Sequence, residues 1–292
     1  MSSPSAPPSI PSSSALRRYL SGADSTLGRL TRILSTTSGV DTTLLTLGYS
    51  LTLVSAQLQR TLEKQLERLA LSVVEKASDA LLPGETLVAT LPTPDGPLAQ
   101  LAAGSKAAAD LIADFRIFLR LWGLLSIYQW AKSTYHSPPA DGLLRRVAWA
   151  QVAVNAAYQY LENGAYLAQH GILPGRSWTA AKQTRWWVWS SRFWAAHVVL
   201  DFVRLARVRQ LRLRNRGAAG VSGVEGEGEK EGRVEAAREE TRWWDEIYVN
   251  AAYAPLTLHW SLEEGCVSEA WVGALGTIAG VIGFRELWKQ SG

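Results

Sequence analysis

The chain has 292 residues, with 30 basic and 26 acidic side chains and a formal net charge of +4. This length is enough for one large or two small domains. The weak positive charge does not indicate nucleic-acid binding, although it suits an anionic membrane surface. The 13 tryptophans and the low charged fraction of 19% favour a bilayer interface, where one end of an indole meets water and the other meets lipid.

The composition predicts four segments in chain order. Residues 1–25 are rich in Ser and Pro and are predicted to be a disordered tail without the features of a secretory signal. We expect a helical membrane-binding domain over residues 26–213, a Gly/Glu-rich flexible linker over 214–240 and a C-terminal helical membrane segment over 241–292. The predicted fold class is all-α: a membrane-associated helical bundle with amphipathic interfacial helices and a C-terminal Gly-rich membrane helix.

The first long helix is predicted to begin near Asp41, acting as N-cap, and to end at Pro83-Gly84. Its apolar residues recur every three or four positions and therefore form one stripe along the helix. Because Thr and Ser are frequent in its uncharged first half, packing in a bundle is favoured over crossing a bilayer. The stripe consists of Leu44, Leu47, Leu51, Val54, Leu58, Leu62, Leu66, Leu69 and Val73.

The next predicted helix runs from Ala102 to about Tyr135. Its uncharged run, Leu121 to Ala131, is too short to span a hydrocarbon core of ~30 Å. Two interpretations stay open: a helix that lies flat in the membrane interface, or a buried bundle helix whose Arg stems reach the surface. In the first, the membrane-binding residues are Arg116, Phe118, Arg120, Trp122, Trp130 and Lys132.

A third helix is predicted from Leu143 to His170, with Gly171 as C-cap. Glu162 and Asn163 lie within it. We interpret them as a hydrogen-bonded polar pair inside a bundle, with a buried acid–base group as the alternative.

The segment from Trp186 to Leu205 has the length of a membrane span. However, Arg192, Asp201 and Arg204 would each cost ~2.5–3.5 kcal/mol near the centre of a bilayer, so an interfacial or bundle-packed helix is favoured. A run of alternating basic and apolar residues follows, which contains Arg207, Arg209, Arg212, Arg214 and Arg216.

The C-terminal segment is predicted to restart at Trp243-Trp244, to break at Pro255 and to form a last helix up to Trp288. Its uncharged part, Ala270 to Phe284, is short for a full span and would need tilt, local thinning or a packing partner. Glycines there include a GxxxG motif, which lets two helices approach closely in a membrane. The predicted helix-packing residues are Gly273, Gly276, Gly280 and Gly283.

Catalytic motifs are absent from the sequence: it has no nucleotide-binding, nucleophile-elbow or zinc-protease pattern, and its four histidines lack ligand spacing. The single cysteine, Cys266, excludes an intramolecular disulfide. Near His259 it could act as a nucleophile, but a small buried side chain is favoured. We therefore expect a protein without enzymatic activity, cofactor or metal.

Four blocks of the sequence, in order, resemble the peroxisomal biogenesis factor 11 family. Residues 39–51 are similar to the family's opening Asp-to-Tyr helix, and residues 115–124 to its Arg-containing helix. Residues 158–163, followed by Gly171-Ile-Leu, are similar to its Tyr/Glu-Asn segment, and the glycine series before Trp288 to its C-terminal membrane helix. The Ser/Pro tail and the acidic linker depart from the pattern, and the chain is most similar to a fungal third (C-type) isoform.

The resemblance implies a location in the peroxisomal membrane and a role in peroxisome proliferation and fission. Family members insert amphipathic helices into one leaflet, self-associate, elongate the membrane and recruit fission machinery. Arg116, Arg120 and Lys132 would then contact anionic phospholipid headgroups, at ~1 kcal/mol each. The implied protein partners are family members in a homo- or hetero-oligomer, the fission machinery and the peroxisomal membrane-protein import receptor. The expected docking site for that receptor is Arg207, Arg209, Arg212 and Arg214, unless this run is a simple positive flank.

Two other functions remain open. Some family members are suspected of channel activity, so a peroxisomal membrane pore for small metabolites is the alternative, in which Arg192 and Asp201 would influence selectivity. A membrane-bound enzyme acting on lipid would depend on Glu162 or His197.

Overall fold

The structure is a computed structural model that describes residues 13–78, 88, 96–173, 175–219 and 227–292. Within these residues the regular structure is entirely helical, which confirms the predicted all-α class. In chain order the elements are α1 (Ser13–Leu34), α2 (Thr37–Ser78), α3 (Pro97–Leu119), the short 3-10 helix η1 (Arg120–Trp122), α4 (Gly123–His136), α5 (Gly142–Gln169), α6 (Ala180–Ala219), α7 (Glu227–Trp260) and α8 (Glu269–Gln290).

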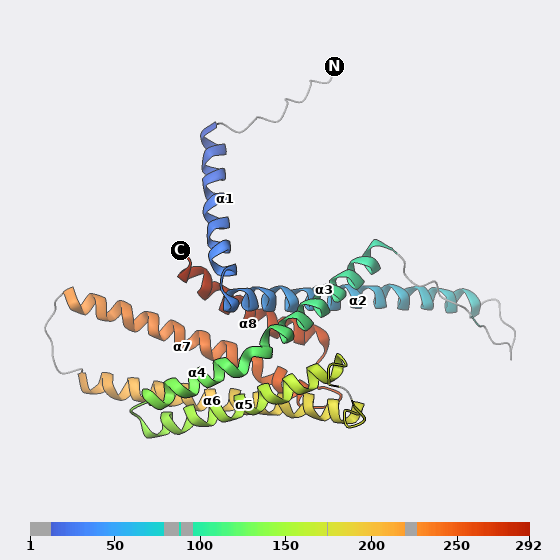
Figure 1. Ribbon diagram of the computed structural model, residues 1–292. Helices are drawn as coiled ribbons and strands as arrows, with labels where there is room; N and C mark the ends of the chain where they lie inside the picture. Colours follow the sequence, from blue (N-terminus) through green and yellow to red (C-terminus); the bar gives the residue numbers. More distant parts are fainter. Residues whose placement is uncertain (1–12, 79–87, 89–95, 174, 220–226) are drawn as a thin grey trace, which may run out of the picture.

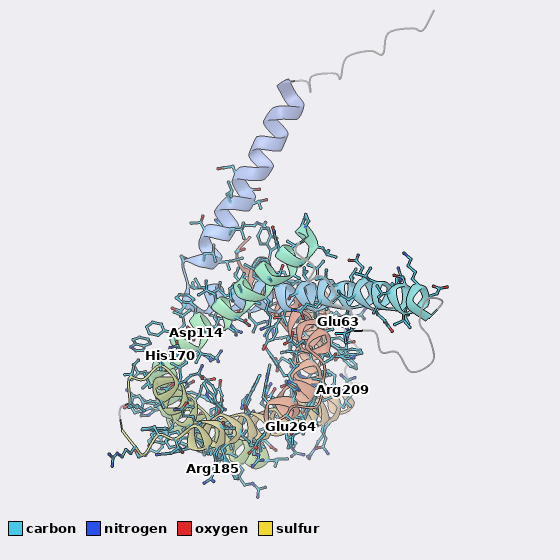
Figure 2. All side chains as sticks on the ribbon, turned by 90° about the vertical axis from the view of Figure 1, so that its right-hand side faces the viewer. Glu63, Asp114, His170, Arg185, Arg209 and Glu264 are labelled. Atoms are coloured by element: carbon cyan, nitrogen blue, oxygen red, sulfur yellow. The ribbon has the colours of Figure 1, made fainter. Side chains whose placement is uncertain are left out.

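Neighbouring helices form a closed ring. Helix α2 packs against both α3 and α8, α3 continues through η1 into α4, and α4 packs against α5. Helix α5 then packs against α6, α6 against α7, and α7 against α8, which returns to α2. Figure 2 looks through this ring, and Figure 1 shows α1 projecting away from it. Each helix of the ring therefore has one side toward the interior and one toward the exterior.

The described parts of two segments predicted to lack regular structure are helical. The predicted tail is helical from Ser13 to its end at residue 25 and continues into the rest of α1, where Leu16, Leu20 and Leu27 recur at helical spacing. The predicted linker over 214–240 is helical up to Ala219 and again from Glu227. Its Glu and Ala residues are good helix formers, a signal that the glycines had obscured. The predicted helix end at Pro83-Gly84 and the Pro-rich loop after it lie outside the described residues.

The predicted break at Pro255 is wrong, since α7 continues through this residue. Proline removes one hydrogen bond from the helical ladder and clashes with the preceding turn. Here the next two residues, Leu256 and Thr257, are buried, so tertiary packing holds the helix on both sides of the proline.

Several polar side chains lie in the interior, and many apolar side chains are exposed on the outside. Buried residues include Gln151, Gln159, Glu162, Asp201 and Asn250. Ionisable residues that face the interior of a helical bundle, with an apolar exterior, are typical of proteins in contact with lipid. Every α-helix exposes at least one large apolar side chain; examples are Leu27, Leu47, Leu111, Leu125, Tyr160, Val199, Leu258 and Trp271.

Among the described residues, one helix has the length and apolar composition of a membrane span. It is α8, with a mean hydropathy of 1.2 over its most apolar window, a third of which is buried inside the protein. This matches the helix that the sequence marked as the C-terminal membrane helix.

Candidate membrane-facing surface and interior polar site

One apolar stripe lies along the outside of α3, η1 and α4. We call Leu111, Phe115, Phe118, Trp122 and Leu125 the outer stripe. They are spaced by three or four residues, so they share one helix face, and all five are exposed. Phe118 and Trp122 meet edge to face, with ring centroids 5.8 Å apart. The outer stripe is therefore a continuous apolar surface available to a partner or a bilayer.

The residues predicted to bind membrane divide between two faces of this helix. Phe118 and Trp122 belong to the outer stripe, and Lys132 is also exposed. Trp130 lies against α6, with its ring centroid 6.5 Å from that of His197. Arg116 and Arg120 lie opposite the outer stripe and are bound to carboxylates within the chain, so in this fold neither is displayed beside Phe118 and Trp122.

Arg116 and Arg120 connect three parts of the ring. Arg116 donates from Nε and Nη2 to the carboxylate of Asp41 on α2, at 2.9 and 3.3 Å. Arg120 donates from the same two nitrogens to the carboxylate of Glu162 on α5, at 3.1 and 2.9 Å. Such two-pronged pairs fix direction as well as distance. Asp41, expected to be an N-cap, instead lies within α2, where it binds Arg116.

Glu162 is the centre of a buried polar cluster. It is 4% exposed, and besides Arg120 it accepts hydrogen bonds from the Tyr158 hydroxyl at 2.8 Å and from Gln159 at 3.4 Å. Asn163 accepts from Gln159 and donates to the backbone carbonyl of Leu121, at 2.7 and 2.9 Å. The cluster supports our interpretation of Glu162 and Asn163 as a structural polar pair: it fastens the kink at η1 to α5.

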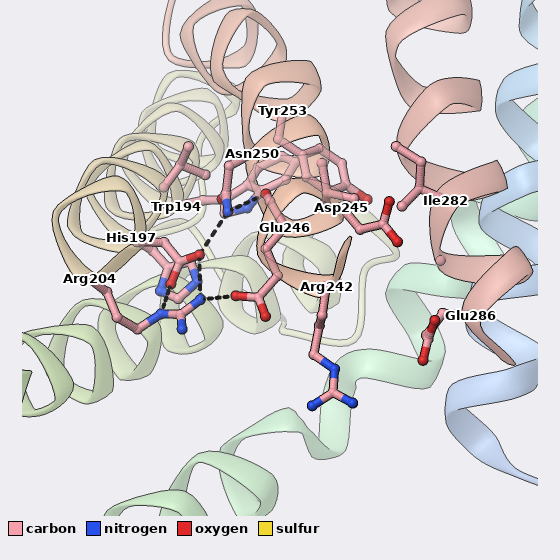
Figure 3. Close-up of a pocket in the computed structure, with 14 residues that line it drawn as sticks. Trp194, His197, Arg204, Arg242, Asp245, Glu246, Asn250, Tyr253, Ile282 and Glu286 are labelled. Atoms are coloured by element: carbon pink, nitrogen blue, oxygen red, sulfur yellow. Dashed lines mark hydrogen bonds and ion pairs between the residues drawn. The ribbon is translucent and has the colours of Figure 1, made fainter. Parts of the chain in front are cut away.

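A second polar cluster surrounds Asp201 of α6, and its members Arg204, Glu246 and Asn250 are labelled in Figure 3. The Asp201 carboxylate accepts from Gln151 at 3.0 Å, from Asn250 at 2.7 Å and from Arg204, which also binds Glu246 of α7. Burial raises the pKa of Asp201, but the combined effect of these donors is larger and opposite. The pKa therefore lies below its ordinary value. Asp201 therefore stays charged and holds α5, α6 and α7 together.

Two adjoining cavities lie inside the ring. The Arg116 cavity, of about 440 Å³, is lined by both arginines, by Tyr49 and Tyr158, and by a set of aromatic residues from α6 and α7. The Asp201 cavity, of about 480 Å³, is lined by residues of α6, α7 and α8. Trp194 and Tyr253 line both, so the two spaces meet at these rings.

The glycines of α8 lie directly on α2. A Cβ added to Gly276 would lie 2.2 Å from the ring of Tyr49, and one added to Gly280 would lie 2.8 Å from the Cα of Thr46. At Gly273 it would lie 2.5 Å from the backbone nitrogen of Leu53, whereas Gly283 is less crowded. The packing partner of the glycine ridge in this structure is thus a helix of the same chain.

The basic run on α6 is largely engaged with neighbouring helices. Arg207 binds Asp141, the N-cap of α5, at 2.7 Å, and hydrogen bonds from Arg207 and from the α5 backbone lower the pKa of Asp141 to about 2. Arg209 binds Glu240 of α7 at 2.6 Å, and Arg212 lies 3.6 Å from Glu239. Arg214 is exposed at the end of the run.

The candidate catalytic groups have structural partners. Nδ1 of His259 accepts from the backbone nitrogens of Cys266 and Val267, so this histidine orders the turn between α7 and α8. Cys266 is exposed, contrary to the expected buried side chain. His197 lies 2.8 Å from Asn155, and burial lowers its pKa. No group of metal-binding side chains is found among the described residues.

Sequence reasoning did not identify the aromatic lining of the Arg116 cavity. Tyr49, Trp194, Tyr253 and Trp260 come from three helices, and nothing in their local spacing marks them as neighbours. The only indication was the high tryptophan content. The sequence alone favours the membrane interface as the reason for this content. In the structure, however, Trp194 stacks on Trp260, and Tyr253 and Tyr49 contact this pair, within the ring of helices.

Comparison with known proteins places the chain in a family. A relative from Schizosaccharomyces pombe, described as an uncharacterized protein, is 28% identical over 190 residues, which cover 63% of this chain and 78% of the relative. It carries no isoform name, so the similarity to a fungal third isoform stays a prediction. No solved structure matches the chain significantly. The family model of peroxisomal biogenesis factor 11 (PEX11) matches residues 87–288, from before α3 into the last turns of α8, and the chain therefore belongs to the PEX11 family of peroxisome biogenesis factors.

Proposed function

We propose that this peroxisome biogenesis factor binds, curves and elongates the peroxisomal membrane during peroxisome proliferation and fission. The observation that carries the proposal is the outer stripe, a row of exposed apolar side chains opposite the half-buried Arg116 and Arg120. The candidate span α8 would hold the chain in the bilayer, and the outer stripe would enter the facing leaflet.

The physical basis is asymmetric insertion. Fully burying a side chain of the size of Leu or Phe stabilises by about 1.5–3 kcal/mol, which favours entry of the outer stripe into the acyl region. Volume added to one leaflet alone expands that leaflet and favours positive curvature. Lys132, on the exposed side of α4, is well placed for anionic headgroups. Arg116 and Arg120 contribute by fixing the orientation of the helix.

Replacing Phe118 and Trp122 with serine is expected to abolish tubulation of anionic vesicles by the full-length chain. Both side chains are exposed, so the substitutions remove inserted apolar surface without opening the core. The measurement is electron microscopy of phosphatidylcholine–phosphatidylserine vesicles after the chain is incorporated from detergent, with thermal unfolding as a check of the fold.

The matched control replaces Leu71 and Val74 with serine; both are more exposed than Phe118 and Trp122 and lie on the part of α2 that extends beyond the ring (Figure 1). This variant should tubulate like the unmodified chain. Equal tubulation by both variants would contradict the proposal. If the unmodified chain leaves vesicles round but conducts ions across planar bilayers, the pore is the better interpretation. The two adjoining cavities inside the ring, each lined in part by charged side chains, favour that second candidate.

We also propose that Arg207, Arg209, Arg212 and Arg214 dock the peroxisomal membrane-protein import receptor. Because the first three bind carboxylates of the same chain, Arg214 is the most accessible of them. Arg214→Glu should lower the fraction of tagged chain at peroxisomes in cells, whereas Arg176→Glu, in an exposed loop, should not. If the Arg214 variant reached peroxisomes as efficiently as the unmodified chain, these arginines would have only a structural role.

Self-association with family members and recruitment of the fission machinery complete the proposal. The ridge of glycines is engaged with α2 in the single chain, so contacts between copies would use other surfaces. The outer stripe and the exposed apolar residues of α7 are the candidates, among them Trp244 and Tyr248.

A further inference from the structure

The Arg116 cavity has an aromatic wall built from several helices. Trp194 and Trp260 stack with centroids 5.5 Å apart, and Tyr253 lies 5.4 Å from Trp194. Tyr158 and Tyr49 extend the wall, at 6.4 Å from Trp194 and 6.5 Å from Trp260 respectively. A cavity of about 440 Å³ is within the usual size of small-molecule sites, and such a wall suits an apolar body.

The polar groups of the cavity are mainly donors. Arg116 and Arg120 each use Nε and Nη2 for their carboxylates, and Arg116 also hydrogen-bonds the hydroxyl oxygen of Tyr49. The second terminal nitrogen of Arg120 and the hydroxyl hydrogen of Tyr49 remain as donors. Among the described residues no hydrogen bond is found for the hydroxyl of Tyr253. Burial raises the pKa of both Tyr49 and Tyr253, so the two hydroxyls remain protonated at neutral pH.

Acceptors in the cavity are already occupied. The Glu162 carboxylate receives donors from Arg120, Tyr158 and Gln159. Asp41 and Glu162 balance the charges of the two arginines, so the surroundings do not favour a polyanion. Hydrogen-bond donors without an acceptor, next to an apolar wall, are complementary to a ligand that carries one acceptor-rich group on an apolar body.

We propose that the Arg116 cavity binds an anionic amphiphile, a molecule with a single carboxylate or phosphate group on an apolar chain or ring. The anionic group would lie among Arg116, Arg120, Tyr49 and Tyr253, and the apolar body against Trp194 and Trp260. This site is separate from the outer stripe and goes beyond the proposed membrane-shaping function.

The test uses the purified full-length chain in nonionic detergent with bromo-octanoate, because bromine quenches tryptophan fluorescence on contact. Saturable quenching is expected, and it should be weakened or absent in Trp194→Phe. Neutral bromo-octanol should bind about tenfold or more weakly, since it offers the arginines no charged acceptor. The double variant Tyr49→Phe with Tyr253→Phe keeps both rings and removes both donors, and its affinity should likewise fall about tenfold or more.

Tyr160→Phe, at an exposed tyrosine of α5, is the matched control and should leave binding unchanged. Competition with dodecyl phosphate, phosphatidic acid vesicles and inorganic phosphate identifies the source of the anion. Competition by dodecyl phosphate alone supports a free amphiphile, and competition by the vesicles as well supports a lipid headgroup. Equal competition by inorganic phosphate, or linear quenching that is identical in all variants, would overturn the proposal. The double tyrosine variant should still tubulate vesicles, so this result is distinguishable from failure of the proposed function.

Discussion

Glu162→Ala is expected to destabilise the ring by about 3–5 kcal/mol, because it leaves the Arg120 guanidinium partly buried without its carboxylate. The substitution also removes the acceptor of the Tyr158 hydroxyl, whereas Gln159 keeps its shorter hydrogen bond to Asn163. The measurement is thermal unfolding of the full-length chain in detergent, followed by circular dichroism. We expect the kink at η1 to lose its connection to α5, since the Arg120–Glu162 pair is the charged part of that connection.

Two further variants test whether the destabilisation by Glu162→Ala comes from the unpaired charge of Arg120 or from lost packing. The double variant Arg120→Met with Glu162→Met removes both charges and should recover most of the stability, since replacing a buried pair with apolar residues of similar volume is often nearly neutral. Glu263→Ala, on the exposed turn after α7, should have almost no effect. If Glu162→Ala were as stable as Glu263→Ala, the cluster would not hold the ring together.

Gly276→Ala is expected to separate α2 from α8 and to destabilise the protein by about 1–3 kcal/mol. The added Cβ would lie 2.2 Å from the Tyr49 ring, a distance that real Cβ contacts do not show, so one of the two helices must move. Because α8 is the candidate span, this change should also weaken the attachment of the ring to the membrane helix.

Gly104→Ala is the matched control, with the same chemical change in another helix. A Cβ at Gly104 meets nothing within 4 Å, so the substitution should stabilise α3 by about 0.5–1 kcal/mol. The two variants should therefore shift the unfolding temperature in opposite directions. Stabilisation by both would mean that α2 and α8 are not in close contact.

Particular elements show why some predictions were confirmed and others were wrong. The predicted limits of α5, Leu143 and His170 with Gly171 as C-cap, and the predicted end of α8 at Trp288 agree with the structure to within a few residues, because helix ends depend largely on local sequence. The break predicted at Pro255 was wrong because burial of Leu256 and Thr257 stabilises a helix that local propensity disfavours. The linker was predicted too long because Glu239 and Glu240 bind α6, an interaction that composition does not reveal.

In the candidate sites too, local sequence predicted some features, and tertiary contacts determined the others. Phe118 and Trp122 could be predicted as surface residues from their spacing with Leu111, Phe115 and Leu125. The sequence could not predict which way Arg116 and Arg120 point, since either face of the helix could have met lipid headgroups. The glycine ridge was evident in the sequence, but nothing local identified α2 as its partner.

By itself the sequence determined that this protein is helical, that one face of the helix around Trp122 is apolar, and that its last helix is rich in glycine and a candidate membrane span. These are properties of residues three or four positions apart. Only the tertiary structure decided that Arg116 and Arg120 turn inward, because their carboxylates come from Asp41 and Glu162, 75 and 42 residues away. It also decided that aromatic residues of separate helices enclose a cavity, since closing the ring brings them together.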